Sequence, residues 1–238
     1  MATALAALIA APEAPPARHI AVGAASPIPA AACWLVKQRG MPVRLSLLHR
    51  QRGNPFTDGT QELFDLTGQG RIDLFVLGGG QIDGQANINL IGTGAWPGEG
   101  ARFPGSFGSA FMYMMVPRTI LFREEHSPRV LVPRVDHVSA PGLSPPGVFR
   151  RGTAQALVTG RAMFRFDAAA GRFTLASVHP GETAAGVRAA TGFDYDAPAE
   201  VPVTPDPTAE DLALLRGAVC DEMLETYPDF CRKVWGRD

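Results

Sequence analysis

In the first third of the chain, short runs of hydrophobic residues alternate with segments in which hydrophobic residues recur at helical spacing. Branched apolar runs at residues 19–23, 43–50 and 72–77 are typical of buried strands. Between them, apolar residues recur at helical spacing over residues 26–40 and 60–70, and a glycine closes each stretch. This repeated strand–helix order predicts an α/β fold, with a mainly parallel open sheet and helices on both faces.

The rest of the chain continues the pattern with less regular elements. Strands are predicted at residues 118–125 and 129–135, and residues 154–166 and 172–178 are predicted to form a hairpin. Residues 107–116 indicate either the start of a buried helix or an apolar wall.

Two further helices are predicted near the C-terminus. One covers residues 183–191, and the other runs from Thr208 to about Tyr227, after a proline-rich arm at 197–207. Because nothing marks a firm boundary, we expect one domain over residues 1–238, with the arm and a terminal helix at 197–238.

Three glycines follow the predicted strand at 72–77: Gly78, Gly79 and Gly80. Without β-carbons, their backbone N–H groups can approach a ligand oxygen closely. Open α/β sheets bind ligands at the carboxyl ends of their strands, so the stretch predicts a cradle for an oxyanion or a phosphate. The alternative is a glycine turn that is packed for steric reasons alone.

Composition excludes several functional classes. With 19% charged residues and a net charge of −1, the chain has no basic field that would attract nucleic acid. Neither the dinucleotide G-x-G-x-x-G pattern nor the phosphate loop occurs. Lys37 and Lys233 are the only lysines, which argues against Schiff-base chemistry. The five histidines show no metal-binding spacing, so no metal site is predicted.

The remaining compositional signals point to a cytoplasmic protein. Cys33, Cys220 and Cys231 are too few and too scattered for a disulfide framework, so reduced thiols are expected. Residues 1–11 lack the positive start of a signal peptide and predict a first helix instead. No window is apolar for the roughly 18 to 20 residues of a membrane span, so no membrane partner is expected.

The order of motifs resembles the β-type subunit of the family I coenzyme A transferases. That family carries a strand followed by G-x-x-Q-[VI]-D-x-x-x-N-x-N, which stands here as Gly78, Gln81, Ile82, Asp83, Asn87 and Asn89. Its Glu-His pair looks like Glu125 and His126, and its P-[KR]-[IV] segment looks like residues 128–130. Its two late motifs look like residues 178–183 and 187–192.

The resemblance implies a coenzyme A-transferase-like (NagB/RpiA-like) fold and an α-type partner in an α2β2 assembly, with the site between the two chains. It also implies an acyl-CoA substrate, with coenzyme A as part of the substrate and no covalently bound cofactor. The runs at residues 77–92, 102–110 and 120–127 are most similar to the hydrolytic branch of the family. In that branch, an α/β pair opens a ring of a steroid-derived acyl-CoA by retro-Claisen cleavage of a β-keto group.

One departure from the family pattern changes the implied chemistry. Family transferases attack the thioester with a glutamate in the turn that precedes the glycine motif, but the matching residues 49–54 contain no carboxylate. Glu62 and Glu99 are the only glutamates between Gly40 and Gly100, and neither stands at the end of a strand. Hydrolysis is therefore the expected activity. The alternatives are a true CoA-transferase and a non-catalytic subunit that completes the partner's site.

The predicted site residues follow from the motif and from this departure. Gly79 and Gly80 would stabilise an oxyanion together with Gln81, while Glu125 and His126 would position the site, and the partner would supply the general base. Ser106 lacks the elbow motif of a serine nucleophile. Residues expected to bind substrate are Arg50, Arg52, Asn54, Gly78, Asp83, Asn87 and Ser106. Four apolar residues either belong to the core or form a wall that contacts the acyl group: Phe103, Phe107, Phe111 and Met112.

Overall fold

The computed structural model describes residues 1–50, 56–97 and 100–237. The chain divides into two compact units, one joining Met1–Val76 to Pro205–Asp238 and the other formed by Leu77–Thr204. Strand β3 (Leu74–Gly78) begins in the first unit and ends in the second. The expectation of one domain over the whole chain stays a prediction, because compact units need not fold independently.

The first unit is built on parallel strands. β1 (His19–Val22) pairs in parallel with both β2 (Arg44–Leu47) and β3, and all four residues of β1 are buried. A fully buried strand of this kind is expected where a parallel sheet is covered on both faces. The helices of this unit are α1 (Ala2–Ile9), α2 (Pro27–Gln38), α3 (Gly59–Gly68), α6 (Ala209–Arg216), α7 (Ala218–Met223) and α8 (Pro228–Trp235).

Helix α2 lies at the centre of the helical part of this unit. Pro27 occupies a first-turn position, where its missing N–H costs nothing, and Gly40 follows the helix with a φ of +90°. Every residue from Ile28 to Val36 is buried, and α2 packs against α1, α6 and α7. The C-terminal helices therefore complete a core that the N-terminal part of the chain begins.

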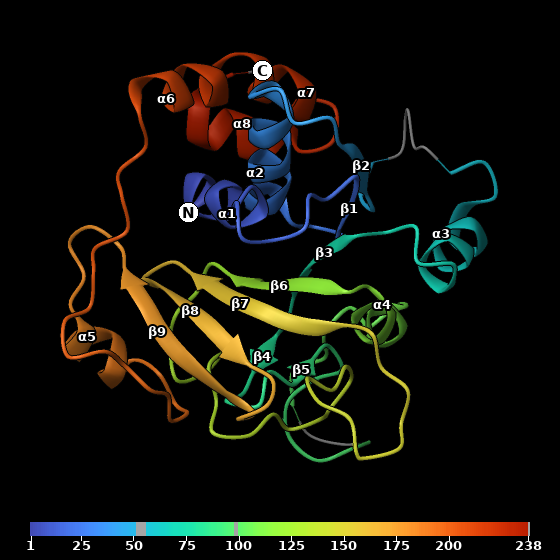
Figure 1. Ribbon diagram of the computed structural model, residues 1–238, viewed down its shortest axis with the longest axis vertical. Helices are drawn as coiled ribbons and strands as arrows, with labels where there is room; N and C mark the ends of the chain where they lie inside the picture. Colours follow the sequence, from blue (N-terminus) through green and yellow to red (C-terminus); the bar gives the residue numbers. More distant parts are fainter. Residues whose placement is uncertain (51–55, 98–99, 238) are drawn as a thin grey trace. The chain divides into compact units, whose positions relative to one another are not determined.

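The second unit combines a β-meander with a small hairpin (Figure 1). β6 (Arg118–Arg123) pairs in parallel with β7 (Thr153–Thr159), and β8 (Ala162–Asp167) and β9 (Arg172–Val178) follow antiparallel. The strand order of the larger sheet is β2-β1-β3-β6-β7-β8-β9. The remaining elements are β4 (Gln81–Ile82), β5 (Ile88–Asn89), α4 (Ser109–Met115) and α5 (Ala184–Ala189).

The predicted α/β class with a mostly parallel sheet is confirmed, but three predicted elements are wrong in detail. Residues 129–135 make only an isolated bridge, between Leu131 and Ile82, since Pro133 cannot donate to a strand ladder. Residues 154–166 are two strands separated by a turn at Gly160. The predicted terminal helix, from Thr208 to about Tyr227, is divided into α6 and α7 with a break at Gly217, and α8 lies beyond its predicted end.

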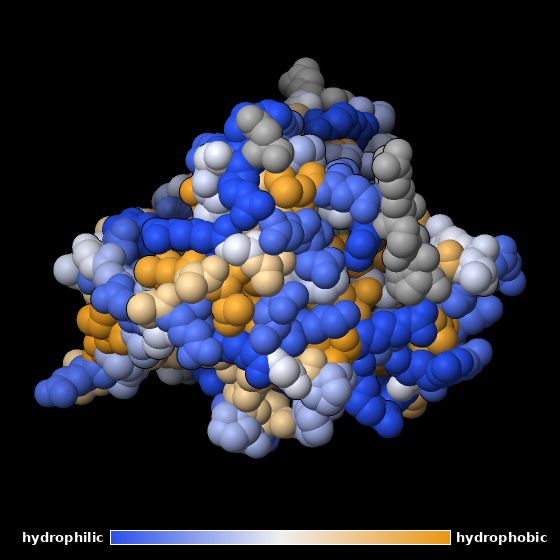
Figure 2. Space-filling view, turned by 90° about the horizontal axis from the view of Figure 1, so that it is seen from above, coloured by the Kyte–Doolittle hydropathy of each residue, from blue (hydrophilic) through white to orange (hydrophobic). Residues whose placement is uncertain are grey.

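The surface is mainly hydrophilic, with hydrophobic residues gathered in separate patches on the face drawn in Figure 2. In the second unit, Phe107 and Phe111 keep 69% and 41% of their surface exposed, whereas Met112 is buried. The predicted acyl wall thus includes one core residue. Among the helices that the structure describes, none combines the length and apolar character that a bilayer span requires.

Candidate functional site

The glycine triplet at the end of β3 is packed tightly. Gly79 is buried, and a β-carbon placed there would lie 2.8 Å from Ile88 Cγ2 and 3.0 Å from the Gln81 carbonyl oxygen. At Gly80, the ring of Phe103 already occupies the position of a β-carbon. A side chain at either position would displace its neighbours in a close-packed interior. Packing alone therefore accounts for both glycines, as the steric alternative expects.

The backbone of Gly80 is also engaged. Its N–H donates to the carbonyl oxygen of Asn89 at 2.8 Å and so joins the triplet to β5. The prediction that this amide is free to hold an oxyanion is wrong for the subunit alone. The position of a Gly78 β-carbon lies 3.3 Å from the Phe122 carbonyl oxygen, beside β6. The roles of Gly78 and Gly79 stay predictions.

The buried amides of Gln81 and Asn89 form the centre of a hydrogen-bond network. Asn89 Nδ2 donates to Gln81 Oε1 at 2.7 Å and to the Gly92 carbonyl at 2.7 Å. Asn89 Oδ1 accepts from the N–H groups of Ile91 and Gly92 at 2.9 and 3.3 Å. Gln81 accepts from the Asp136 N–H at 3.0 Å and donates to the Asp136 carboxylate at 3.2 Å. Gln81 therefore holds the scaffold together, and its predicted catalytic role stays a prediction.

Asp83 and Asn87 continue this network around the β4–β5 hairpin. Asp83 Oδ1 accepts from the N–H groups of Gln85 and Asn87 at 3.0 and 3.1 Å. Asp83 Oδ2 accepts from Asn87 Nδ2 at 3.1 Å and from the Val135 N–H at 3.3 Å. Asn87 Oδ1 accepts from the Gly142 N–H at 3.0 Å. The polar residues of the motif thus brace the hairpin against residues 135–142.

An open groove of about 720 Å³ lies beside this hairpin. Asp83 and Asn87 line it, but their polar atoms already have the partners described above. Arg172 also lines the groove, and it is paired with Asp196 at 2.8 Å. The groove is large enough for a small ligand, and the substrate-binding roles of Asp83 and Asn87 stay predictions.

Glu125 belongs to an ion-pair cluster at the end of β6. Its carboxylate accepts from Ser127 Oγ and from Arg129 Nη2, each at 2.6 Å, and lies 3.7 Å from Arg123 Nη2. The hydrogen bond from Ser127, followed by the contacts with Arg129, lowers the pKa of Glu125. Glu125 is therefore an ionised carboxylate that pairs with two arginines, and its positioning role stays a prediction.

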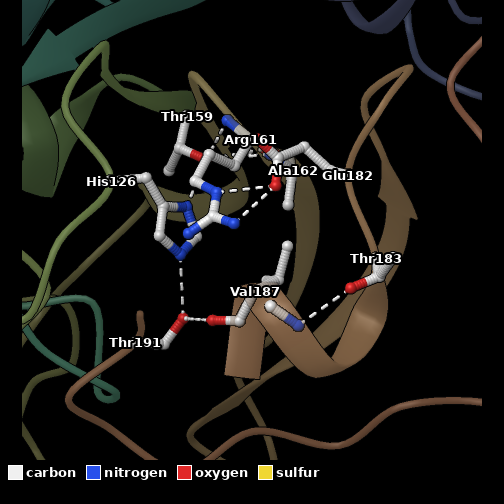
Figure 3. Close-up of polar contacts among 9 residues, drawn as sticks. His126, Thr159, Arg161, Ala162, Glu182, Thr183, Val187 and Thr191 are labelled. Atoms are coloured by element: carbon white, nitrogen blue, oxygen red, sulfur yellow. Dashed lines mark hydrogen bonds and ion pairs between the residues drawn. The ribbon is translucent and has the colours of Figure 1, made fainter. Parts of the chain in front are cut away.

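His126 is held between two threonines (Figure 3). Its Nδ1 lies 2.7 Å from Thr159 Oγ1, and its Nε2 lies 2.9 Å from Thr191 Oγ1. Each threonine hydroxyl also bonds a backbone carbonyl, Thr191 that of Val187 and Thr159 that of Ala162. Burial, and then the charge of Arg161, lower the pKa of His126 to about 4. A neutral imidazole therefore ties the end of β7 to the end of α5.

Of the four remaining residues predicted to bind substrate, the structure describes Arg50 and Ser106. Arg50 lies in the first unit, where its guanidinium is 4.0 Å from the Glu225 carboxylate. Arg52 and Asn54 lie outside the described residues. Ser106 is half-buried in the second unit, and its carbonyl accepts from the Ser109 N–H at the start of α4.

Glu62 caps a helix instead of pointing into a site. Its carboxylate accepts from the Thr57 N–H at 2.6 Å, from the Thr57 hydroxyl at 3.0 Å and from the Asp58 N–H at 3.3 Å. These donors precede the first turn of α3, where a carboxylate is favoured. The described glutamate closest in sequence to the missing nucleophile is therefore committed to structure.

Sequence reasoning missed a pair of stacked rings at the end of β2. His49 follows this strand and is exposed, and its ring stacks on that of Tyr227 with centroids 5.4 Å apart and planes 10° apart. Nothing in the local sequence links the two residues. Only the presence of a histidine in the turn that lacks the family glutamate could have drawn attention to His49.

Comparison with known proteins identifies relatives, although no family model matches the chain. It is 32% identical to the B-type subunit of the glutaconate CoA-transferase of Acidaminococcus fermentans over 139 residues, 55% of this chain and 52% of that protein. It is 31% identical to the cholesterol ring-cleaving hydrolase IpdB subunit of Rhodococcus jostii over 160 residues, 66% of this chain and 62% of that protein. The matched part thus spans less than two thirds of either relative.

Solved structures extend the likeness of the fold over most of the chain. IpdAB of Rhodococcus jostii superposes with a TM-score of 0.77 at 23% identity and covers 91% of each chain. The decarboxylase AibA/AibB superposes with a TM-score of 0.75 at 23% identity, over 90% of this chain and 92% of the other. These likenesses concern the fold. Together with the curated relatives, they confirm the resemblance in the motifs: the chain is a homologue of B-type subunits of coenzyme A transferases and of the hydrolase subunit IpdB, and has their α/β fold.

Proposed function

We propose that this chain is the β-type subunit of a heteromeric acyl-CoA hydrolase and that it works with an α-type partner. Its similarity to a hydrolase subunit and to a transferase subunit supports an acyl-CoA substrate. The fold that it shares with IpdAB and AibA/AibB supports pairing with a second type of chain. Coenzyme A would be part of the substrate, without a covalently bound cofactor.

The observation that carries the proposal is the missing nucleophile. Residues 49–54 contain no carboxylate, and Glu62 is used as a helix cap. Covalent transfer requires a side chain that attacks the thioester and holds the acyl group between two half-reactions. Without such a side chain, water is the attacking group that remains, and the reaction becomes a hydrolysis.

The proposed reaction is a retro-Claisen cleavage of a β-keto acyl-CoA, with a ring derived from a steroid as the favoured substrate. Water adds to the ketone carbon, and the carbonyl electron pair moves onto oxygen. When this oxyanion collapses, the bond between the former ketone carbon and the α-carbon breaks. The α-carbon then takes a proton, which leaves a carboxylic acid and an opened thioester. We retain the Gly79 N–H as a donor to the oxyanion, but not the Gly80 N–H, whose acceptor is Asn89.

The test is an assay of the chain with and without its α-type partner. The substrate is oxocyclohexanecarboxyl-CoA, a cyclic β-keto thioester whose hydrolytic opening gives pimeloyl-CoA. We expect no turnover by this chain alone and formation of pimeloyl-CoA by the complex, followed by mass spectrometry. The ester of an unsubstituted cyclohexane acid, which has no ketone, is the matched control and should remain intact.

Other products would contradict the proposal in distinguishable ways. Transfer of CoA to acetate or succinate, or a borohydride-trapped glutamyl adduct on this chain, would identify a true CoA-transferase. Release of CO2 would indicate a decarboxylase. Full turnover by the α-type partner alone would leave this chain as a non-catalytic subunit that completes the partner's fold.

A further inference from the structure

Exposed large hydrophobic side chains are distributed unevenly along the chain. Among the residues that the structure describes, six of them fall between residues 96 and 149, whereas Val203 and Val234 are the only others. Single exposed hydrophobic residues are ordinary on a protein surface, but a group of them marks a contact with another molecule. We call this group the aromatic face, and its members are Trp96, Phe107, Phe111, Val138, Val148 and Phe149.

Hydrogen bonds and ring contacts bring the segments that carry these residues together within the second unit. The Leu90 carbonyl accepts from the Gly105 N–H at 3.1 Å, and the Leu90 N–H donates to Ser139 Oγ at 2.9 Å. The ring of Trp96 lies edge-on to that of His137, with centroids 6.4 Å apart. The loop that precedes α4 and the segment around Ser139 therefore meet at Leu90.

The loop that leads into β7 is tied to α4. Arg150 donates from Nη1 to the Pro141 carbonyl at 2.8 Å and from Nη2 to the Tyr113 carbonyl at 3.4 Å. Every member of the aromatic face stands within two positions along the chain of a residue that makes one of these contacts. The six exposed side chains therefore belong to segments that pack against one another.

Phe107 is held in a backbone conformation that is unfavourable for it. Its φ is +46°, in the left-handed region where a β-carbon crowds the backbone, and 69% of its surface is exposed. A glycine would adopt this conformation freely. Burial in the fold does not explain an aromatic side chain at this position, and strain of this kind is typical of residues that contact another molecule.

Positive charge accompanies the aromatic face. The guanidinium of Arg102 lies 3.7 Å from the centre of the Trp96 ring. Over residues 92–97, 100–113 and 134–152, the structure describes four arginines and a single acidic residue, Asp136, although the net charge of the whole chain is −1. The arginines are Arg102, Arg134, Arg150 and Arg151. A molecule that covers this face should therefore carry acidic groups.

This charge pattern favours a different protein over a second copy of this chain. Two copies related by a twofold axis would present the same face to each other and would bring arginines against arginines. We propose that the aromatic face is the docking surface for the α-type partner, whose matching surface is apolar at its centre and acidic at its edge. This inference rests on the proposed function, which requires such a partner.

The affinity of the full-length chain for its α-type partner, measured by calorimetry, tests the docking surface. Phe149→Asp replaces a side chain that is 69% exposed, so the fold should be unaffected, and it places a carboxylate against an acidic partner. We expect Kd to increase by about 30-fold or more, the effect of losing an interfacial hot spot. Val203 is 59% exposed in the same unit but lies outside the aromatic face. Val203→Asp is therefore the matched control, and its Kd should stay within about twofold of the original.

Phe107→Gly separates docking from a structural role. Because glycine relieves the left-handed strain, the urea midpoint of the chain alone should stay the same or rise. Kd for the partner should nevertheless increase by about 10-fold. A lower midpoint together with an unchanged Kd would mean that Phe107 serves the fold, and it would overturn the inference.

Ionic strength tests the acidic edge of the partner. Between about 50 and about 500 mM salt, the association rate constant should fall by about 10-fold, because salt screens the attraction between opposite charges. Arg151 is exposed, and Arg151→Gln should weaken this dependence. An association rate constant that does not respond to salt would contradict an acidic partner surface.

The remaining outcomes separate this inference from the function on which it rests. If the partner binds through the aromatic face but the complex forms no pimeloyl-CoA, docking stands and the proposed function fails. If the complex forms pimeloyl-CoA and Phe149→Asp binds the partner as tightly as the original chain does, the function stands and docking is overturned. Variants that raise KM without changing Kd would assign the face to the acyl group instead. Self-association of the chain that Phe149→Asp abolishes would assign it to a second copy, and either result would overturn the inference.

Discussion

Asn89 shares with Asp83 the densest side-chain hydrogen bonding of the glycine motif. Its side chain makes four hydrogen bonds in a fully buried position. Asn89→Leu would leave buried donors and acceptors without partners, so we expect a loss of about 3 kcal/mol in the free energy of unfolding. Urea denaturation measures this loss. Gln85→Ala, in the same hairpin but with an exposed side chain, should cost less than about 0.5 kcal/mol.

Gly79 is expected to stabilise the fold because it leaves room for its neighbours, in addition to any catalytic role of its backbone N–H. A methyl group at this position would lie 2.8 Å from Ile88 Cγ2, so Gly79→Ala should lower the free energy of unfolding by about 1 to 3 kcal/mol. At Gly23 the nearest atom to an added β-carbon, the Val76 carbonyl oxygen, is 3.5 Å away. Gly23→Ala is therefore the control and should leave the melting temperature nearly unchanged. Equal effects of the two substitutions would contradict the role of packing.

At this scale, the sequence identifies the right residues but not what they do. Gly79, Gln81 and Asp83 could be recognised because the motif is local. Their partners could not, because Asp136 and Val135 lie more than 50 positions further along the chain. A polar residue whose partners are distant in the sequence looks the same as one that awaits a ligand.

The start of α6 allows a test at the scale of single elements. The Thr208 hydroxyl accepts from the Asp211 N–H, and the Asp211 carboxylate accepts from the Thr208 N–H, which forms a capping box. Asp211 also pairs with Arg39, beyond the end of α2. Thr208→Ala should cost about 1 kcal/mol, measured by thermal denaturation. Ser26 precedes α2 but makes no side-chain cap, so Ser26→Ala should cost clearly less.

Elements were predictable where the periodic pattern and its end signals agreed. α2 and β1 satisfy both conditions, and both form where expected. The predicted terminal helix had good periodicity, but the chain breaks it at Gly217, whose φ of −103° and ψ of −108° are not helical. Segment 129–135 had a strand-like composition, but its pairing with β4 stops at a single bridge, between Leu131 and Ile82. Pairing is a tertiary property, which explains why composition misled there.

Acid should destabilise the folded chain through His126. The folded-state pKa of His126 is lowered to about 4 by burial and then by Arg161, whereas an exposed histidine has a pKa of about 6.5. Between these values the unfolded chain binds the proton and the folded chain does not. The full stability is present above about pH 6.5 and is lost progressively towards about pH 4, by on the order of 3 kcal/mol. Urea unfolding between about pH 7.5 and about pH 4.5 measures this slope.

His126→Phe tests the origin of that slope. Phenylalanine can occupy the space beside Phe164, whose ring centroid lies 6.2 Å from that of His126, but it cannot take up a proton. The variant should be less stable at neutral pH, because two threonine hydrogen bonds are lost. Its stability should depend less steeply on pH over the same interval. An unchanged slope would assign the acid sensitivity to other groups, such as His179, whose pKa burial also lowers.

The division of the chain has a consequence for its synthesis. The ribosome releases residues from the N-terminus onwards, so Leu77–Thr204 emerges complete while Met1–Val76 still lacks Pro205–Asp238. Until then, the sides of α2 that pack against α6 and α7 have no cover. A nascent chain halted before Pro205 would therefore present an apolar α2 to chaperones.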